Sequence, residues 1–253
     1  MKAAMDNDII PRLQEKFQTK KYIRRSCIVG GITESDLATL LADFELHLPA
    51  EYNLAYLPSL GYIRLRLSAW GEENHPGLKQ QAGKLKKILG GYFVGKGEMM
   101  PEEMLGEKLR KEKLTISTAE SCTGGYIAHK ITVVPGASDY FEGSIVSYDN
   151  RIKEEILNVD NEAIISEGVV SRVVVEQMAM NVAKKLNTDC SIAVSGIMGP
   201  DGGTKNKPVG TVWIATLKNN EIVSNIYNVG RSRKQNIQRT TNLAILQIGR
   251  ASR

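Results

Sequence analysis

Two periodicities of apolar and polar residues run through the first part of the chain. Ile63, Leu65 and Leu67 alternate with arginines, a period of two that predicts a strand with one buried and one solvated face. Elsewhere apolar residues recur at helical spacing. In chain order, the pattern predicts a helix at 9–17, a strand at 22–29, a helix at 34–46, strands at 54–57 and 62–67, a helix at 77–89 and a strand at 92–94. This order, αβαββαβ, describes a small α+β domain.

A different pattern begins after the segment Gly95-Lys-Gly-Glu-Met-Met-Pro101. Its glycines and proline interrupt the periodicity and mark a domain boundary. Beyond it, helical and strand-like runs alternate. We expect helices at 102–111, 124–132, 151–157, 173–186 and 236–248, and strands at 114–117, 144–148, 191–195, 209–217 and 221–229. This alternation predicts an α/β fold, an α/β/α sandwich whose central sheet is covered on both faces.

The composition is that of a water-soluble protein, with 42% hydrophobic residues and few aromatics. No apolar run has the length needed to span a bilayer, and the first residues lack the apolar core of a signal peptide. Cys27, Cys122 and Cys190 are too few and too scattered for a disulfide framework or a metal site. We therefore expect a cytoplasmic protein with no membrane partner.

The charge balance indicates an anionic partner. A net charge of +5 and a pI near 9.0 suit either a small anionic substrate or a nucleic acid. The basic clusters are local, however, and such clusters are typical of solvated faces. The first domain has the element order of a KH domain but no Gly-x-x-Gly clamp loop, which Gly30-Gly31 does not replace. A nucleic acid is therefore not the expected partner.

One turn contains several side chains that could take part in catalysis. The segment Thr118-Ala-Glu-Ser-Cys-Thr-Gly-Gly125 lies between an expected strand and an expected helix. Free N–H groups at a helix start can hold an anion or a developing oxyanion, and a hydroxyl there is placed to attack a carbonyl. The alternative is a helix cap, a routine role for Ser and Thr. Local chemistry alone favours the cap.

The same segment resembles the signature of the CinA family, whose C-terminal domain is the nicotinamide-nucleotide amidase also called PncC. The similarity runs from about Glu103 to the end of the chain. Four further segments match in the same order: Val134-Pro-Gly-Ala-Ser138, Val146-Ser-Tyr-Asp-Asn-Arg-Ile-Lys153, Val194-Ser-Gly-Ile-Met-Gly-Pro-Asp-Gly-Gly203 and Lys207-Pro-Val-Gly-Thr-Val-Trp213.

The first part of the chain resembles the middle domain of full-length CinA proteins, though less distinctively. The similar segments are Gly31-Ile-Thr-Glu-Ser35, Leu54-Ala-Tyr-Leu-Pro58 and Tyr62-Ile-Arg-Leu-Arg-Leu67. The resemblance divides the chain into a middle domain at 1–97 and an amidase domain at 101–253. The family's N-terminal domain, which resembles molybdopterin-binding proteins, has no counterpart here. We therefore expect a shortened form of the family's chain.

The resemblance implies hydrolysis of nicotinamide mononucleotide to nicotinate mononucleotide and ammonia, with Ser121 as the nucleophile. Cys122 is the rival nucleophile, although it suits a role as a small packed hydrophobe better. No histidine is a convincing base, so a Ser–Lys arrangement is the alternative. The family's matching lysine is Lys153, which needs burial or a cationic neighbour to lower its pKa. Otherwise it is a surface residue. Tyr148 is the third catalytic candidate, or a rim aromatic.

The resemblance and the glycines together indicate the substrate contacts. Backbone N–H groups after Ser121 would hold the oxyanion. The glycine-rich loop suits phosphate or ribose hydroxyls, although a flexible surface loop is the alternative. The candidate binding residues are Thr123, Gly124, Gly125, Ser195, Gly196, Gly199, Gly202, Gly203 and Thr204. Asp201 has no second carboxylate at a metal spacing, so we expect neither a metal nor a cofactor.

An arginine before the last helix is the candidate phosphate contact. Many family members have Gly-Asp-Arg where this chain has Gly230-Arg-Ser-Arg233. Arg233 is the better match to the family's arginine, and Arg239 is the second. Arginine suits a phosphate because its guanidinium binds the group bidentately. We also expect a homodimer or a higher homo-oligomer. The alternative function is that of a catalytically silent or competence-related binding protein of the family.

Overall fold

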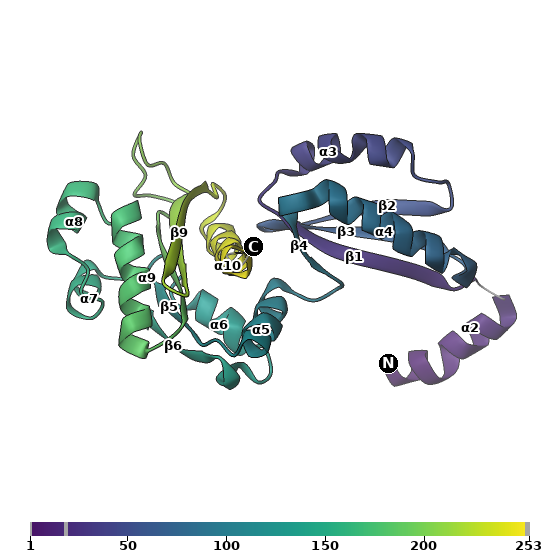
Figure 1. The fold of residues 1–253 in the computed structure, drawn as a ribbon, viewed down its shortest axis with the longest axis horizontal. Helices are drawn as coiled ribbons and strands as arrows, with labels where there is room; N and C mark the ends of the chain where they lie inside the picture. The colour runs from purple at the N-terminus through teal and green to yellow at the C-terminus, as the bar shows by residue number, and fades with distance from the viewer. Residues whose placement is uncertain (1, 18–19, 251–253) are drawn as a thin grey trace. The chain divides into compact units, whose positions relative to one another are not determined.

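The computed structural model describes residues 2–17 and 20–250. The chain divides into two compact units, one of residues 1–57 with 63–97 and the other of residues 58–62 with 98–253. Each unit contains one β-sheet (Figure 1). The first sheet has four strands and the second has five. Residues 58–62 thus interrupt the first unit and belong to the second.

The first unit has the αβαββαβ order that the sequence predicts. Its helices and strands are α1 (Lys2–Ala4), a π-helical turn (Met5–Ile9), α2 (Ile10–Phe17), β1 (Tyr22–Gly30), α3 (Glu34–Leu46), β2 (Tyr52–Ser59), β3 (Tyr62–Trp70), α4 (His75–Leu89) and β4 (Phe93–Lys96). The sheet order is β2-β3-β1-β4, and β1 pairs antiparallel with β4. The apolar stripe Ile63, Leu65 and Leu67 packs in one core with Leu37 of α3 and Leu78 of α4.

The second unit is an α/β/α sandwich, so the expected fold class is confirmed. Its helices and strands are α5 (Pro101–Glu112), β5 (Ile116–Glu120), α6 (Tyr126–Thr132), β6 (Phe141–Val146), α7 (Asn150–Glu155), α8 (Asn161–Glu167), α9 (Arg172–Leu186), β7 (Cys190–Gly196), β8 (Thr211–Lys218), β9 (Glu221–Asn228) and α10 (Arg233–Arg250). The sequence pattern missed the short helix α8 and placed the start of α10 three residues late.

The five strands lie in the order β6-β5-β7-β8-β9. β5 is parallel to both β6 and β7, whereas β8 and β9 continue the sheet antiparallel. One face packs against α5, α6 and α10, and the other packs against α9 (Figure 1). Every residue of β5 is buried, because this strand is interior in the sheet and both of its faces are covered.

Candidate active site

The three parallel strands end at one edge of the larger sheet. β5 leads into Ser121, β6 leads into Ser147 and Tyr148, and β7 ends in Ser195 and Gly196. Ligands of open α/β sheets bind outside the carboxyl ends of such strands. A pocket of about 190 Å³ opens at this edge, and its lining consists of Ser121, Cys122, Tyr148, Asn150, Lys153, Val169, Val170, Ser195, Gly196, Met198 and Arg233.

Ser121 is placed by the sheet itself. β5 runs to Glu120 rather than ending at Ser117 as expected, so Ser121 is the first residue beyond the strand. Its backbone N–H donates to the Val194 carbonyl at 3.1 Å. Its side chain lines the pocket, and no other residue in the described part of the chain hydrogen-bonds its hydroxyl. The hydroxyl is therefore available to a ligand.

Lys153 lies in the interior, and the alternative of a surface lysine is wrong. The residue is 1% exposed. Its Nζ donates to the carbonyls of Ser147 at 2.8 Å and Tyr148 at 3.3 Å, and to Asn150 Oδ1 at 3.5 Å. Burial lowers the pKa of Lys153 below its ordinary value, and the Asp149 carboxylate opposes this shift. The buried amine thus meets the condition for a general base.

Cys122 is a packed core residue. It is 6% exposed and belongs to the core cluster beneath α6 and α10. Burial raises the pKa of its thiol to about 12. A thiol with such a pKa is almost entirely protonated at neutral pH, and the thiolate is the nucleophilic form. The choice between the two neighbouring nucleophiles therefore favours Ser121.

The carboxylate of Glu120 occupies the start of α6. It accepts hydrogen bonds from the N–H groups of Gly125, Ile127 and Ala128 at 3.1, 3.0 and 2.8 Å. It also accepts one from the Thr123 hydroxyl at 2.6 Å. An anion at a helix N-terminus satisfies the free N–H groups and the helix dipole. The anion site at this helix is thus filled by the chain's own side chain.

Three residues expected to contact the substrate have partners within the chain instead. The Thr123 hydroxyl and the Gly125 N–H bind Glu120, and the Gly124 N–H donates to the Ser121 carbonyl at 3.2 Å. No oxygen atom of the described residues accepts a hydrogen bond from the N–H groups of Cys122 and Thr123. These two groups, rather than those of Gly124 and Gly125, are the donors available for an oxyanion.

The Glu120 contacts lead to a prediction about stability. Glu120→Gln should lower the free energy of unfolding by about 1–3 kcal/mol, because a buried acceptor of several N–H groups becomes an amide that is itself partly a donor. Urea unfolding followed by circular dichroism measures the change. Glu142→Gln, an exposed change on β6, is the control. An equal loss in both variants would contradict the capping role.

Tyr148 and Arg233 meet beside the pocket. Arg233 Nη2 donates to Tyr148 Oη at 2.9 Å, and Nη1 donates to the Gly199 carbonyl at 2.7 Å. Both side chains are exposed. A guanidinium has five N–H bonds, of which two are engaged within the described residues. Arg233 is therefore held in place with donors left for an anion.

The family model of the CinA C-terminal domain matches residues 99–251, more than half of the chain. The chain belongs to the CinA family. Curated relatives are similar in sequence to this chain along nearly its whole length. A CinA-like protein of Cytophaga hutchinsonii is 41% identical over 253 residues, and one of Flavobacterium psychrophilum is 42% identical over 252. These matches cover 99% and 98% of this chain and 60% of each relative. The chain thus spans about 60% of the length of these CinA relatives.

Solved CinA superfamily structures share the fold of about 60% of this chain. A competence/damage-inducible protein of Agrobacterium tumefaciens is 32% identical with a TM-score of 0.56, and the match covers 60% of this chain and 97% of that chain. A CinA superfamily protein of Escherichia coli is 26% identical with a TM-score of 0.58, over 60% and 88%. The matched part therefore occurs in these proteins as most of a chain.

The remaining expected contacts of this CinA chain divide in two. Ser195 and Gly196 line the pocket, whereas Gly199, Gly202, Gly203, Thr204 and Arg239 are not among its lining residues. Gly199 acts through its carbonyl, which holds Arg233. Thr204 closes a turn, because its N–H donates to the Lys207 carbonyl and its hydroxyl accepts from the Lys207 N–H.

Sequence reasoning missed four lining residues of the CinA pocket. They are Asn150, Val169, Val170 and Met198. Asn150 and Met198 lie inside motifs that match the family, and this is the signal that could have found them. Val169 and Val170 follow helix α8, which the pattern also missed, and apolar residues of a loop carry no chemical signal of their own.

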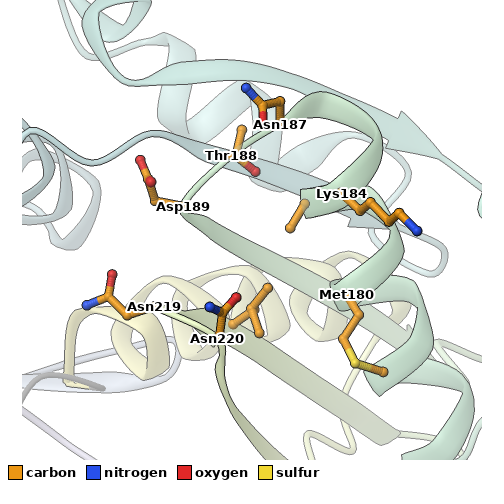
Figure 2. A pocket seen from close by; sticks show the side chains of 9 residues that line it. Met180, Lys184, Asn187, Thr188, Asp189, Asn219 and Asn220 are labelled. Carbon is orange, nitrogen blue, oxygen red and sulfur yellow. The ribbon is translucent and has the colours of Figure 1, made fainter.

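A larger hollow of about 700 Å³ lies at the opposite end of β7 (Figure 2). It lies between the end of α9, the turn before β7 and the β8–β9 turn. Its lining consists of Met180, Ala183, Lys184, Asn187, Thr188, Asp189, Leu217, Asn219 and Asn220. The Asp189 carboxylate already accepts from the N–H and hydroxyl of Thr115. The one hydroxyl in this lining, that of Thr188, is already hydrogen-bonded to the Ser117 hydroxyl and the Cys190 carbonyl, so the smaller pocket is the candidate active site.

Residues 2–17 and 20–250 contain no group of three or more His, Cys, Asp or Glu side chains placed to hold a metal ion. Across the same ranges, each helix is too short or too polar to cross a membrane.

Proposed function

We propose that the chain is a nicotinamide-nucleotide amidase, which hydrolyses the carboxamide of nicotinamide mononucleotide to nicotinate mononucleotide and ammonia. The observation that carries this proposal is the buried Lys153, whose pKa is lowered, in the lining of the pocket that also contains Ser121. An amide hydrolase needs such a base beside its nucleophile. The resemblance to the CinA amidase domain supplies the substrate.

In the proposed reaction, the neutral Lys153 amine takes the proton of Ser121 while Oγ attacks the carboxamide carbon. The N–H groups of Cys122 and Thr123 bind the oxyanion. Lys153 then returns the proton to the leaving nitrogen, and ammonia departs. Water attacks the acyl-enzyme with Lys153 again as the base, which releases the nicotinate and restores Ser121. Release of Nζ from its long contact with Asn150 at 3.5 Å would free the amine for this role.

The size of the pocket suits the reacting end of the nucleotide. Ligand pockets commonly measure about 300–1,000 Å³, whereas this one has about 190 Å³. The pyridine carboxamide would enter, and the ribose phosphate would remain at the rim. Arg233 and Tyr148 are exposed there. Tyr148 accepts from Arg233, so its own hydroxyl hydrogen stays available to the substrate.

The phosphate contact predicts an effect on affinity. Arg233→Ala should weaken the binding of nicotinamide mononucleotide roughly ten- to hundredfold, because a charge-assisted contact contributes about 1.5–3 kcal/mol. Titration calorimetry measures the dissociation constant. Arg231→Ala removes the same charge from an exposed residue outside the pocket lining and should change little. Equal losses in both variants would point to general electrostatics rather than to a contact.

The direct test of the proposed function is ammonia release. Purified protein is incubated with nicotinamide mononucleotide, and ammonia is followed by a coupled glutamate dehydrogenase assay. The nucleoside without its phosphate should be turned over poorly. A protein that binds the nucleotide but releases no ammonia would be a silent member of the family, and the amidase proposal would fail.

A further inference from the structure

One wall of the pocket is formed by a loop. Val169 and Val170 line the pocket from residues 168–171, which join α8 to α9. The loop turns sharply at Gly168, where φ is +82°. An irregular loop of this kind needs partners for its carbonyl groups when it is packed against the protein. Those partners determine where the two valines stand.

Two side chains from distant segments hold the carbonyls of this wall. The Ser195 hydroxyl, at the end of β7, donates to the Val169 carbonyl at 2.8 Å. Lys207 Nζ, in the loop between β7 and β8, donates to the carbonyls of Val170 at 2.8 Å and Glu167 at 2.9 Å. Three of four consecutive carbonyls are therefore tied to side chains.

Lys207 is placed for this task. It is half-buried, whereas Lys205 in the same loop is exposed. Its ammonium has no carboxylate partner among the described residues, so its role is to hold carbonyls rather than to neutralise a charge. The turn that it closes with Thr204 fixes its backbone. A Cβ at Gly168 would stand 3.3 Å from Nζ, so the glycine leaves the ammonium its space.

The loop that carries Lys207 also reaches the other side of the site. Its Gly199 carbonyl accepts from Arg233. One segment, residues 197–210, thus contacts both the valine wall and the arginine at the rim. Within this segment Met198 lines the pocket, whereas none of the segment's glycines does.

We propose that Lys207 is a positioning residue, which holds the Val169–Val170 wall against the flat face of the substrate's pyridine ring. The identity of that ring rests on the proposed amidase function. The tether between Lys207 and the wall does not, because it is present in the free protein. Contact with a non-reacting ring face acts on the ground state and the transition state alike. Loss of the tether should therefore raise KM more than it lowers kcat.

The first experiment measures how readily the Val169–Val170 wall opens in the ligand-free protein. Lys207→Met keeps the stem and removes the donors, Lys207→Arg restores donors, and Lys205→Met is the matched control. Amide hydrogen exchange over residues 167–171 should quicken roughly tenfold in Lys207→Met, since local opening costs less. It should return toward the wild-type rate in Lys207→Arg and stay at that rate in Lys205→Met. Unchanged exchange in Lys207→Met would overturn the tether.

The second experiment measures how much the contact with the pyridine ring contributes to substrate binding. The KM for nicotinamide mononucleotide should rise roughly tenfold in Lys207→Met, with kcat reduced less than about threefold. Inhibition by ribose 5-phosphate, which lacks the ring, should be unchanged. Val169→Ala should reproduce this split without touching Lys207, and so serves if Lys207→Met does not fold. Equal weakening of both ligands, or an unaltered KM, would overturn the ring contact.

Failure of the proposed function can be recognised separately. If the wild type releases no ammonia, the dissociation constant of nicotinamide mononucleotide by titration calorimetry replaces KM. A roughly tenfold weaker dissociation constant in Lys207→Met, with ribose 5-phosphate unaffected, would support the wall contact. An unchanged constant would overturn it, whatever the exchange data show.

Discussion

Ser121→Ala should reduce ammonia release to below about 0.1% of the wild-type rate, because loss of a nucleophile removes the covalent route entirely. The fold should persist, since Ser121 contributes its backbone N–H to the sheet edge and its hydroxyl to no described partner. Initial rates with nicotinamide mononucleotide, together with circular dichroism of the variant, measure both parts. Binding of the nucleotide should survive, because the rim contacts are unchanged.

Cys122→Ala is the matched control for this prediction. The thiol is buried, and its pKa is raised to about 12 by burial. Its replacement should cost a modest packing loss and leave most of the activity. The reverse outcome, an active Ser121→Ala and an inactive Cys122→Ala, would transfer the nucleophile to the cysteine.

Lys153→Met should lower kcat about 10²- to 10⁴-fold, the usual contribution of a positioned general base. The affinity for the nucleotide should change much less, because the amine acts on the chemical step. In the wild type, activity should rise with pH through the lowered pKa of Lys153, since only the neutral amine accepts the proton. That rise should be missing in the variant. A pH profile that keeps it would assign the base to another group.

The same variant should gain stability at neutral pH. Burial lowers the pKa of Lys153 in the folded state, so the unfolded chain binds the proton more tightly and the charged form opposes folding. This penalty is complete below the folded pKa and disappears as the pH approaches the ordinary lysine value. Lys153→Met should therefore unfold at higher urea concentration than wild type, by a margin that shrinks at alkaline pH. Lys185→Met, an exposed change on α9, should show no such trend.

A more active or less stable Lys153→Met would contradict this account. Because lost activity and gained stability have opposite signs, general damage to the fold cannot imitate the result. Lys153→Met also removes the hydrogen bonds to the Ser147 and Tyr148 carbonyls. The free energy gained by removing the buried amine must exceed the free energy lost with these two bonds.

Local periodicity was enough to predict the fold class. The alternation of Ile63, Leu65 and Leu67 predicted β3, and the alternation of helices and strands after residue 101 predicted the α/β/α sandwich. The pattern failed where an element is short or wholly buried. α8 spans seven residues, and β5 has no exposed face to give an alternation. Its true end at Glu120 depends on pairing with β6 and β7, which lie elsewhere in the chain.

The sequence by itself determined the residue types of the candidate site and the turn that carries Ser121, because a motif is a local arrangement of neighbours. Only the tertiary structure decided their electrostatic states. Lys153 became a buried amine because α7 packs it beneath the end of β6, and Glu120 took the helix N-terminus that had been assigned to substrate. The Val169–Val170 wall and its tether to Lys207 join three distant segments. Burial and hydrogen-bond partners are properties of such contacts between segments, and a linear pattern does not contain them.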